Sequence, residues 1–250
     1  MAFLAPDNVR YENGVKICEK IIPDSAVWNK NYTEGGYTYL KGTQYKANRA
    51  LTAMRGVTIH NTGRIKVPSG TTMAEQYTRA TYPNCNMGSV RVHYYVDENE
   101  AWQNLDEGEV GWHAADGNYG PGNSTTVAIE IIMDGTNAEY NRIAEDNGAR
   151  LCAAILKRHG LDETAVFQHH DWYARKDCPA YIRPHWSAFL AAVRQYLSDD
   201  TQVPSDYDKL VAELAGLKEQ LQLQHANAQD FRDEILAAVA TGGISFDGEV

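Results

Sequence analysis

Residues 56–61 read GVTIHN, and the interpretation of the whole chain starts from this stretch. The β-branched residues Val57 and Ile59 alternate with polar ones, which is typical of a β-strand. Successive side chains of a strand point to opposite faces of a sheet, so Val57 and Ile59 face a core while His60 faces the other way. The pattern predicts a strand that ends in a histidine on its polar face.

Segments with strand and helix patterns alternate along the rest of the chain. The predicted strands cover residues 89–97, 101–103, 127–133 and 165–169, and the predicted helices cover 138–159 and 184–197. The apolar strand at 127–133 is interrupted only by Glu130. A carboxylate is costly to bury in such a strand, so Glu130 is expected to have a specific role there. Strands alternating with helices predict an α/β sandwich.

Both ends of the chain differ from this middle part. Residues 1–50 show little periodicity, and we expect an extended arm with short turns there. The main domain is expected over residues 1–198, followed by a linker, a helical segment and a tail at 199–206, 207–241 and 242–250. Apolar residues three and four apart in the helical segment favour an amphipathic or coiled-coil helix. Either a lone helix packed on the domain or a homo-oligomer fits that spacing.

Composition excludes some classes of function. The formal net charge is -10 and there is no basic tract, which argues against nucleic acid as a partner. No signal peptide is visible, and no segment approaches the roughly 20 apolar residues that a membrane helix needs. We therefore expect a protein made in the cytoplasm, without a membrane partner.

The four cysteines are scattered, and Cys152 lies in a helical pattern as a small buried hydrophobe.

Four residues suggest metal chemistry: His60, the pair His169 and His170, and Cys178. Three nitrogen and sulfur ligands leave zinc one open position, which is the arrangement of a catalytic zinc site. Spacing alone is weak evidence, because a single histidine on a strand is more often structural. The surrounding residues strengthen the interpretation.

Residues 56–62 (GVTIHNT) resemble the first zinc-ligand strand of the type 2 amidases, a family that includes phage lysins and peptidoglycan recognition proteins. HHDW at 169–172, followed by KDCP at 176–179, resembles the closing motif of that family. The loop at 112–123 and the strand at 127–131 resemble its middle, especially in lysins of Bacillus phages. The resemblance covers roughly residues 45–195 and implies a central mixed β-sheet flanked by helices.

The resemblance also implies roles for individual residues. His60, His169 and Cys178 match the family's zinc ligands. Glu130 matches its base, and Lys176 matches a residue that offsets negative charge. The implied reaction is zinc-dependent hydrolysis of the amide bond between N-acetylmuramic acid and L-alanine in bacterial peptidoglycan. The implied setting is a phage or prophage endolysin that is made in the host cytoplasm and acts on the cell wall after release.

The loop that starts at Trp112 holds the expected contacts with substrate. His113 lies where the family has a histidine that contacts substrate, and Trp112 and Asn118 are further candidates. A core-packing role remains open for Trp112. For Glu130 the structural alternative is a salt-bridged core carboxylate, and for Lys176 it is a solvated loop residue.

The sequence departs from the family in two places. The stretch from His169 to Cys178 is one residue longer than usual, so counting back from Cys178 selects His170 as the ligand. We expect His169 instead, because a loop absorbs an insertion more easily than a strand end shifts register. At the second place, Val92 replaces a tyrosine next to His93, which leaves Glu130 to carry the proton transfer.

Other functions compatible with the sequence belong to different classes. A non-catalytic peptidoglycan-recognition module is the main alternative, although relatives of that kind typically lack the cysteine ligand. A zinc peptidase or an amidase for another substrate is a second one, since loops determine specificity. An oligomerising or wall-anchoring adaptor built on the C-terminal helix is a third.

Overall fold

The computed structural model describes residues 4–198 and, beyond them, six residues of the C-terminal segment. The chain divides into two units, residues 1–201 and 202–250, and each is considered by itself. The described residues of the second unit are helical, namely Leu221, Ala228, Gln229, Arg232, Leu236 and Ala237. The predicted linker at 199–206 and the tail at 242–250 lie outside the described residues. Self-association through the helical segment stays a prediction.

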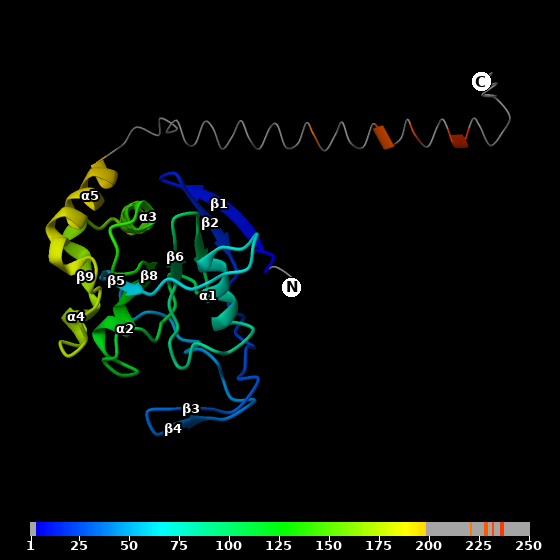
Figure 1. Cartoon of the computed structure of the whole chain (residues 1–250). Helices are drawn as coiled ribbons and strands as arrows, with labels where there is room; N and C mark the ends of the chain where they lie inside the picture. Colours follow the sequence, from blue (N-terminus) through cyan, green and yellow to red (C-terminus); the bar gives the residue numbers. More distant parts are fainter. Residues whose placement is uncertain (1–3, 199–220, 222–227, 230–231, 233–235, 238–250) are drawn as a thin grey trace, which may run out of the picture. The chain divides into compact units, whose positions relative to one another are not determined.

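A mixed seven-stranded sheet forms the centre of the first unit (Figure 1). Its strands are β1 (Asn8–Glu12), β2 (Val15–Glu19), β5 (Gly56–Thr62), β6 (Tyr94–Val96), β7 (Ala101–Gln103), β8 (Thr126–Ile132) and β9 (Val166–Gln168). They follow the order β1-β2-β7-β6-β8-β5-β9. Strands β6, β8, β5 and β9 run parallel to their neighbours in this row, whereas β6 and β7 pair antiparallel. The predicted fold class is confirmed.

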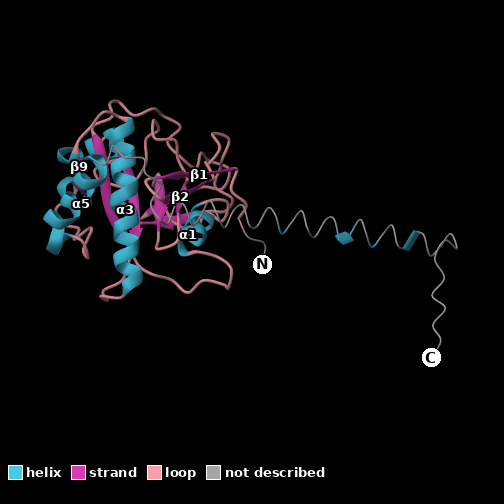
Figure 2. Cartoon of the chain, turned by 90° about the horizontal axis from the view of Figure 1, so that it is seen from above, coloured by secondary structure: helices cyan, strands magenta, loops and turns pink. Residues whose placement is uncertain are grey.

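Helices flank both faces of this sheet. They are α1 (Met73–Thr81), α2 (Pro121–Thr125), α3 (Glu139–Arg158), α4 (His169–Trp172) and α5 (Trp186–Ser198), with short 3₁₀ turns at Glu163–Ala165 and Arg183–His185. Helices α3 and α5 lie side by side on one face (Figures 1 and 2). Helix α1 packs on the other face, where Met73 and Tyr77 join a cluster with Tyr95.

Alternation along the central strands decides which residues reach each face. Val57 and Ile59 belong to the core beneath α3 and α5, as their spacing predicts. Ala128 and Ile132 belong to the opposite core, with α1. Glu130 has the same parity as these two, so its side chain leaves the sheet on the α1 side.

The N-terminal residues differ from the expected arm. Residues 8–19 form the hairpin β1–β2, which lengthens the sheet through parallel pairing of Ile17 with Ala101. A second hairpin, β3 (Tyr32–Glu34) with β4 (Tyr37–Tyr39), forms a separate two-stranded sheet. Within the described part of the chain, no helix has both the length and the apolar character needed to cross a membrane.

Candidate metal and catalytic site

The candidate site lies where neighbouring strands of the central sheet end. His60 on β5 pairs in register with Glu130 on β8, so the two side chains leave adjacent strands on the same face. Strand β9 lies on the other side of β5 and ends at Gln168. His169 opens helix α4 at once, so its side chain also reaches the end of β5. Parallel pairing thus gathers residues that are more than 100 positions apart in sequence.

Three buried side chains form a compact group of donor atoms at this edge: His60, His169 and Cys178. Their possible ligand atoms all lie within 4.8 Å of one another. The Nδ1 atoms of His60 and His169 are 2.9 Å apart, and Cys178 Sγ lies 3.9 Å from His60 Nδ1. Two imidazole nitrogens and one thiolate are donors that suit Zn²⁺ and leave a fourth position open. The residues present fit a zinc ion.

Burial sets the protonation states of this group. It lowers the pKa of His60 well below its ordinary value and that of His169 to about 4, so both imidazoles are neutral near pH 7. Burial raises the pKa of the Cys178 thiol to about 11, and the charge of Glu130 acts in the same direction. The imidazoles are ready to coordinate a metal, whereas the thiol must release its proton on binding.

His170 lies outside this group of donors. Its backbone N–H donates to the carbonyl of Cys178 at 2.9 Å, and its Nδ1 lies 3.1 Å from the carbonyl oxygen of Lys176. These contacts fasten the loop between α4 and Cys178. The structure therefore brings His169, and not His170, next to His60.

Glu130 and Lys176 are charged residues that act on the donor group. The Oε2 atom of Glu130 is buried without a hydrogen-bond partner, and no ion pair to Glu130 occurs within residues 4–198. Burial raises the pKa of Glu130 to about 7, while the charge of Lys176 pulls it down. Lys176 is exposed and lines the pocket next to His169. A carboxyl group that titrates near neutral pH is suited to accept and return a proton.

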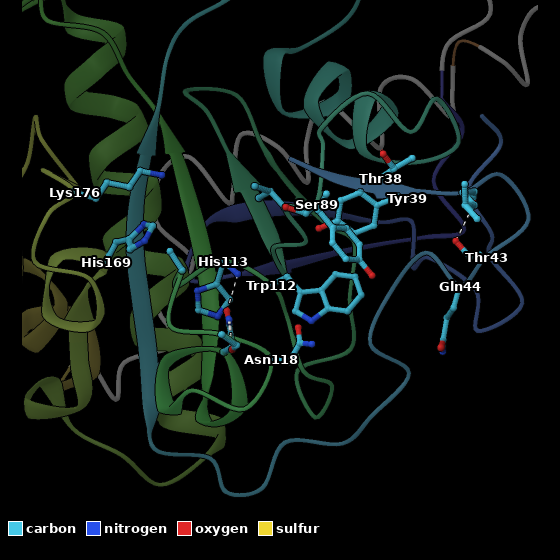
Figure 3. A pocket seen from close by; sticks show the side chains of 16 residues that line it. Thr38, Tyr39, Thr43, Gln44, Ser89, Trp112, His113, Asn118, His169 and Lys176 are labelled. Atoms are coloured by element: carbon cyan, nitrogen blue, oxygen red, sulfur yellow. Dashed lines mark hydrogen bonds between the residues drawn. The ribbon is translucent and has the colours of Figure 1, made fainter. Parts of the chain in front are cut away.

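The three expected substrate contacts lie in different surroundings. His113 is buried, and its Nδ1 lies 3.1 Å from His60 Nε2, on the opposite side of that ring from the donor group. Trp112 is half-buried and Asn118 is exposed. All three line a pocket of about 740 Å³, which also includes His169 and Lys176 (Figure 3).

Asn123 is a site residue that sequence reasoning did not single out. Its Oδ1 accepts the backbone N–H groups of His113 and Ala114, at 2.7 and 2.9 Å. Asp116 Oδ2 in turn accepts the N–H of Gly122 at 2.6 Å. This network holds the loop that presents Trp112 and His113. The sequence feature that could have indicated Asn123 is GPGN at 120–123, in which the asparagine follows a Gly-Pro turn.

The comparison with known families is decisive at this point. The family model described as N-acetylmuramoyl-L-alanine amidase matches residues 49–181, which include the three donors, Glu130 and Lys176. The chain belongs to this family. The matched range covers β5 to the loop after Cys178, and leaves out both N-terminal hairpins.

Similar proteins come mainly from Bacillus. The chain is 29% identical over 178 residues to the N-acetylmuramoyl-L-alanine amidase CwlH of Bacillus subtilis, covering 69% of this chain and 68% of CwlH. It is 29% identical over 152 residues to XlyA of the same organism, covering 61% of this chain but only 48% of XlyA. The solved catalytic domain of XlyA superposes with a TM-score of 0.55 at 26% identity, covering 72% of this chain and 99% of that domain. The chain thus spans about half of XlyA, and matches all of its catalytic domain.

Proposed function

We propose that this chain is a zinc-dependent N-acetylmuramoyl-L-alanine amidase that acts as an endolysin on bacterial peptidoglycan. The observation that carries the proposal is the buried group of His60, His169 and Cys178, in which His60 pairs in register with Glu130 and His169 reaches the pocket. Membership of the amidase family supports the reaction, and the likeness to a solved mutant endolysin from Bacillus subtilis, with a TM-score of 0.55 at 26% identity, supports the setting.

Each residue of the site has a defined task in this reaction. His60, His169 and Cys178 would hold the zinc ion, which supplies Lewis-acid polarisation of a carbonyl and lowers the pKa of water. Glu130 accepts a proton from the attacking water and returns it to the leaving alanine nitrogen. Lys176 offsets negative charge on the carbonyl oxygen as it becomes tetrahedral. His113 supports the His60 ring from behind through its Nδ1 contact.

The first test compares metal content and peptide release in the wild type and in Cys178→Ser. We expect one equivalent of zinc in the wild type, and release from purified peptidoglycan of peptides with a free N-terminal alanine. Both should be lost in Cys178→Ser, because a serine hydroxyl is a poor ligand for zinc. His170→Ala is the matched control and should retain the zinc, because His170 contacts only the loop backbone.

The alternative outcomes separate the competing functions. A metal-free, inactive wild type that still binds peptidoglycan would indicate a recognition module. Release of peptides without a new N-terminal alanine would indicate a peptidase or an amidase for another bond. Loss of zinc in His170→Ala, with retention in His169→Ala, would reverse the assignment of the ligands.

A further inference from the structure

The hairpin β3–β4 forms a wall of the pocket that His169 of the donor group also lines. Tyr39 and Gln44 line this pocket together with His169 and Lys176 (Figure 3). Tyr37 also belongs to the lining. The hairpin comes before residue 49, so it lies outside the part of the chain that the amidase family model matches. The pocket lining thus includes residues from outside the matched range.

Aromatic packing and one carboxylate fix the hairpin in place. The ring of Trp28 stacks on Tyr32 and Tyr39, with ring centroids 5.4 and 5.0 Å apart. Glu34 Oε2 accepts both the backbone N–H and the hydroxyl of Ser89, each at 3.0 Å. Ser89 itself lines the pocket, so this contact joins the hairpin to the opposite part of the wall. A wall held in this way needs little ordering when a ligand binds.

Tyr37 is presented to solvent at the tip of this wall. Its side chain is 64% exposed, although its ring edge packs on Tyr39 at 4.9 Å between centroids. Leu40, which also lines the pocket, is 55% exposed. A rigid tyrosine offers a flat apolar face and a polar tip for a small loss of side-chain entropy, so it is well suited to contact a ligand.

The lining of the pocket combines a largely apolar surface with polar groups that are almost all uncharged. Its hydroxyl and amide groups come from Thr38, Thr43, Gln44, Ser89, Asn118 and Asn123. Among the described residues that line the pocket, Lys176 is the sole lysine or arginine, and there is no carboxylate. Free carboxylates and amino groups of a stem peptide would call for charged partners. N-acetylated sugars carry hydroxyl and amide groups, which this lining matches.

We infer that the β3–β4 hairpin is a glycan subsite, in which Tyr37 stacks on a sugar ring of the strand beyond the muramic acid that is cut. This inference rests on the proposed function, because it places the scissile amide at the His169 end of the same pocket. The hydroxyl and amide groups around Tyr37 bind the polar edge of the sugar while the tyrosine ring covers its apolar face.

The test uses the full chain and two substrates that share one stem peptide. The first carries a single N-acetylmuramic acid, and the second carries a glycan strand of at least three disaccharides. For Tyr37→Ala we expect the KM for the glycan strand to rise roughly threefold to tenfold, because the loss of one aromatic contact weakens binding by about that factor. The kcat should be retained. The KM on the single sugar should not change. Tyr37→Phe keeps the ring and should keep most of the affinity.

Controls separate this inference from the proposed function and from misfolding. Tyr11→Ala removes a tyrosine that is 49% exposed on β1, away from the pocket lining, and should behave as the wild type on both substrates. An unchanged melting temperature shows that Tyr37→Ala is folded. Equal KM values for Tyr37→Ala and wild type on the strand would overturn the glycan subsite, as would an effect that follows peptide length. A wild type that cuts neither substrate would instead overturn the proposed function.

Discussion

Glu130 occupies an uncommon position for a carboxylate, inside a parallel strand and beside a candidate metal ligand. Its pKa of about 7 has two opposing causes, since burial raises it and the charge of Lys176 lowers it. A bound zinc ion would add a second positive charge and lower this pKa further. The carboxylate form is therefore favoured at neutral pH once the metal is present, and this is the form that accepts a proton.

Replacing Glu130 with glutamine should slow hydrolysis by roughly a hundredfold to ten-thousandfold, the usual contribution of a general base. Wild-type activity should fall as the pH drops through the pKa of Glu130, which bound zinc holds below the value of about 7 that burial alone gives, and Glu130→Gln should lose this limb of the pH profile. Rates measured across pH, with zinc content measured in parallel, check both statements. Glu139→Gln, at an exposed ion pair on α3, is the control. An unchanged rate in Glu130→Gln would remove Glu130 from the mechanism.

Among the contacts between secondary-structure elements, helix α3 packs against strand β8, which carries Glu130 of the candidate site. A Cβ atom added at Gly148 would meet Ile131 Cδ1 at 2.3 Å and Cγ1 at 2.8 Å. The helix can approach β8 this closely because residue 148 has no side chain. Ile131 directly follows Glu130, so displacement of this contact would also disturb the base.

Gly148→Ala should therefore destabilise the protein, although alanine is the better helix former. Overpacking costs about 1–3 kcal/mol, whereas the gain in helix propensity is at most about 1 kcal/mol. Thermal unfolding should show a lower melting temperature. Gly63→Ala is the matched control, since a Cβ there meets no atom within 4 Å. A melting temperature equal to that of the wild type would show that α3 moves away from β8 without cost.

The elements that sequence patterns predicted are those with long periodic runs. Strands β5 and β8 and helices α3 and α5 lie within one or two residues of the predicted bounds. The hairpin β1–β2 was missed because its strands have five residues each and gain their place through pairing with β7. Helix α1 was missed because it has only nine residues, and its N-cap is a single hydrogen bond in which the Thr72 side chain accepts the backbone N–H of Glu75.

The site was accessible to sequence reasoning only in part. His60 and His169 are 109 residues apart, and no periodicity relates them. Family motifs, rather than spacing, therefore singled out the donor group. Parallel pairing of β5 with β8 and β9 explains why these residues meet. The pocket wall at Tyr37 carried no motif, because its role depends on how a separate hairpin docks against Ser89.

At the scale of the whole domain, four of the histidines within residues 4–198 are buried as neutral bases. Burial lowers the pKa of His93 and His169 to about 4, and lowers those of His60 and His113 well below their ordinary value. His93 is further held by its contacts with the N–H of Ala128 and the carbonyl of Glu109. An unfolded chain would protonate these four imidazoles below about pH 6.5, whereas the folded chain keeps them neutral to a lower pH.

The sign of the resulting pH dependence follows from proton counts. Between about pH 6.5 and 4 the unfolded chain binds protons at these histidines and the folded chain does not, so the free energy of unfolding falls as the pH falls. Glu130 acts in the opposite direction, because its raised pKa lets the folded state bind a proton first. Asp97, whose pKa burial also raises, acts in the same direction as Glu130, so two groups oppose four and the net effect is loss of stability in acid.

We therefore expect the urea midpoint of the chelator-treated protein to decrease steadily from about pH 7.5 to about pH 5. Excess zinc should raise the midpoint at pH 7.5 and lose this effect by pH 5, because a metal that needs two neutral imidazoles and a thiolate competes with protons. Unfolding followed by tryptophan fluorescence, with and without zinc, measures both trends. A midpoint that stays constant over this range in chelator would show that the histidines take up protons in the folded state. The buried group could then not serve as a set of neutral metal ligands under these conditions.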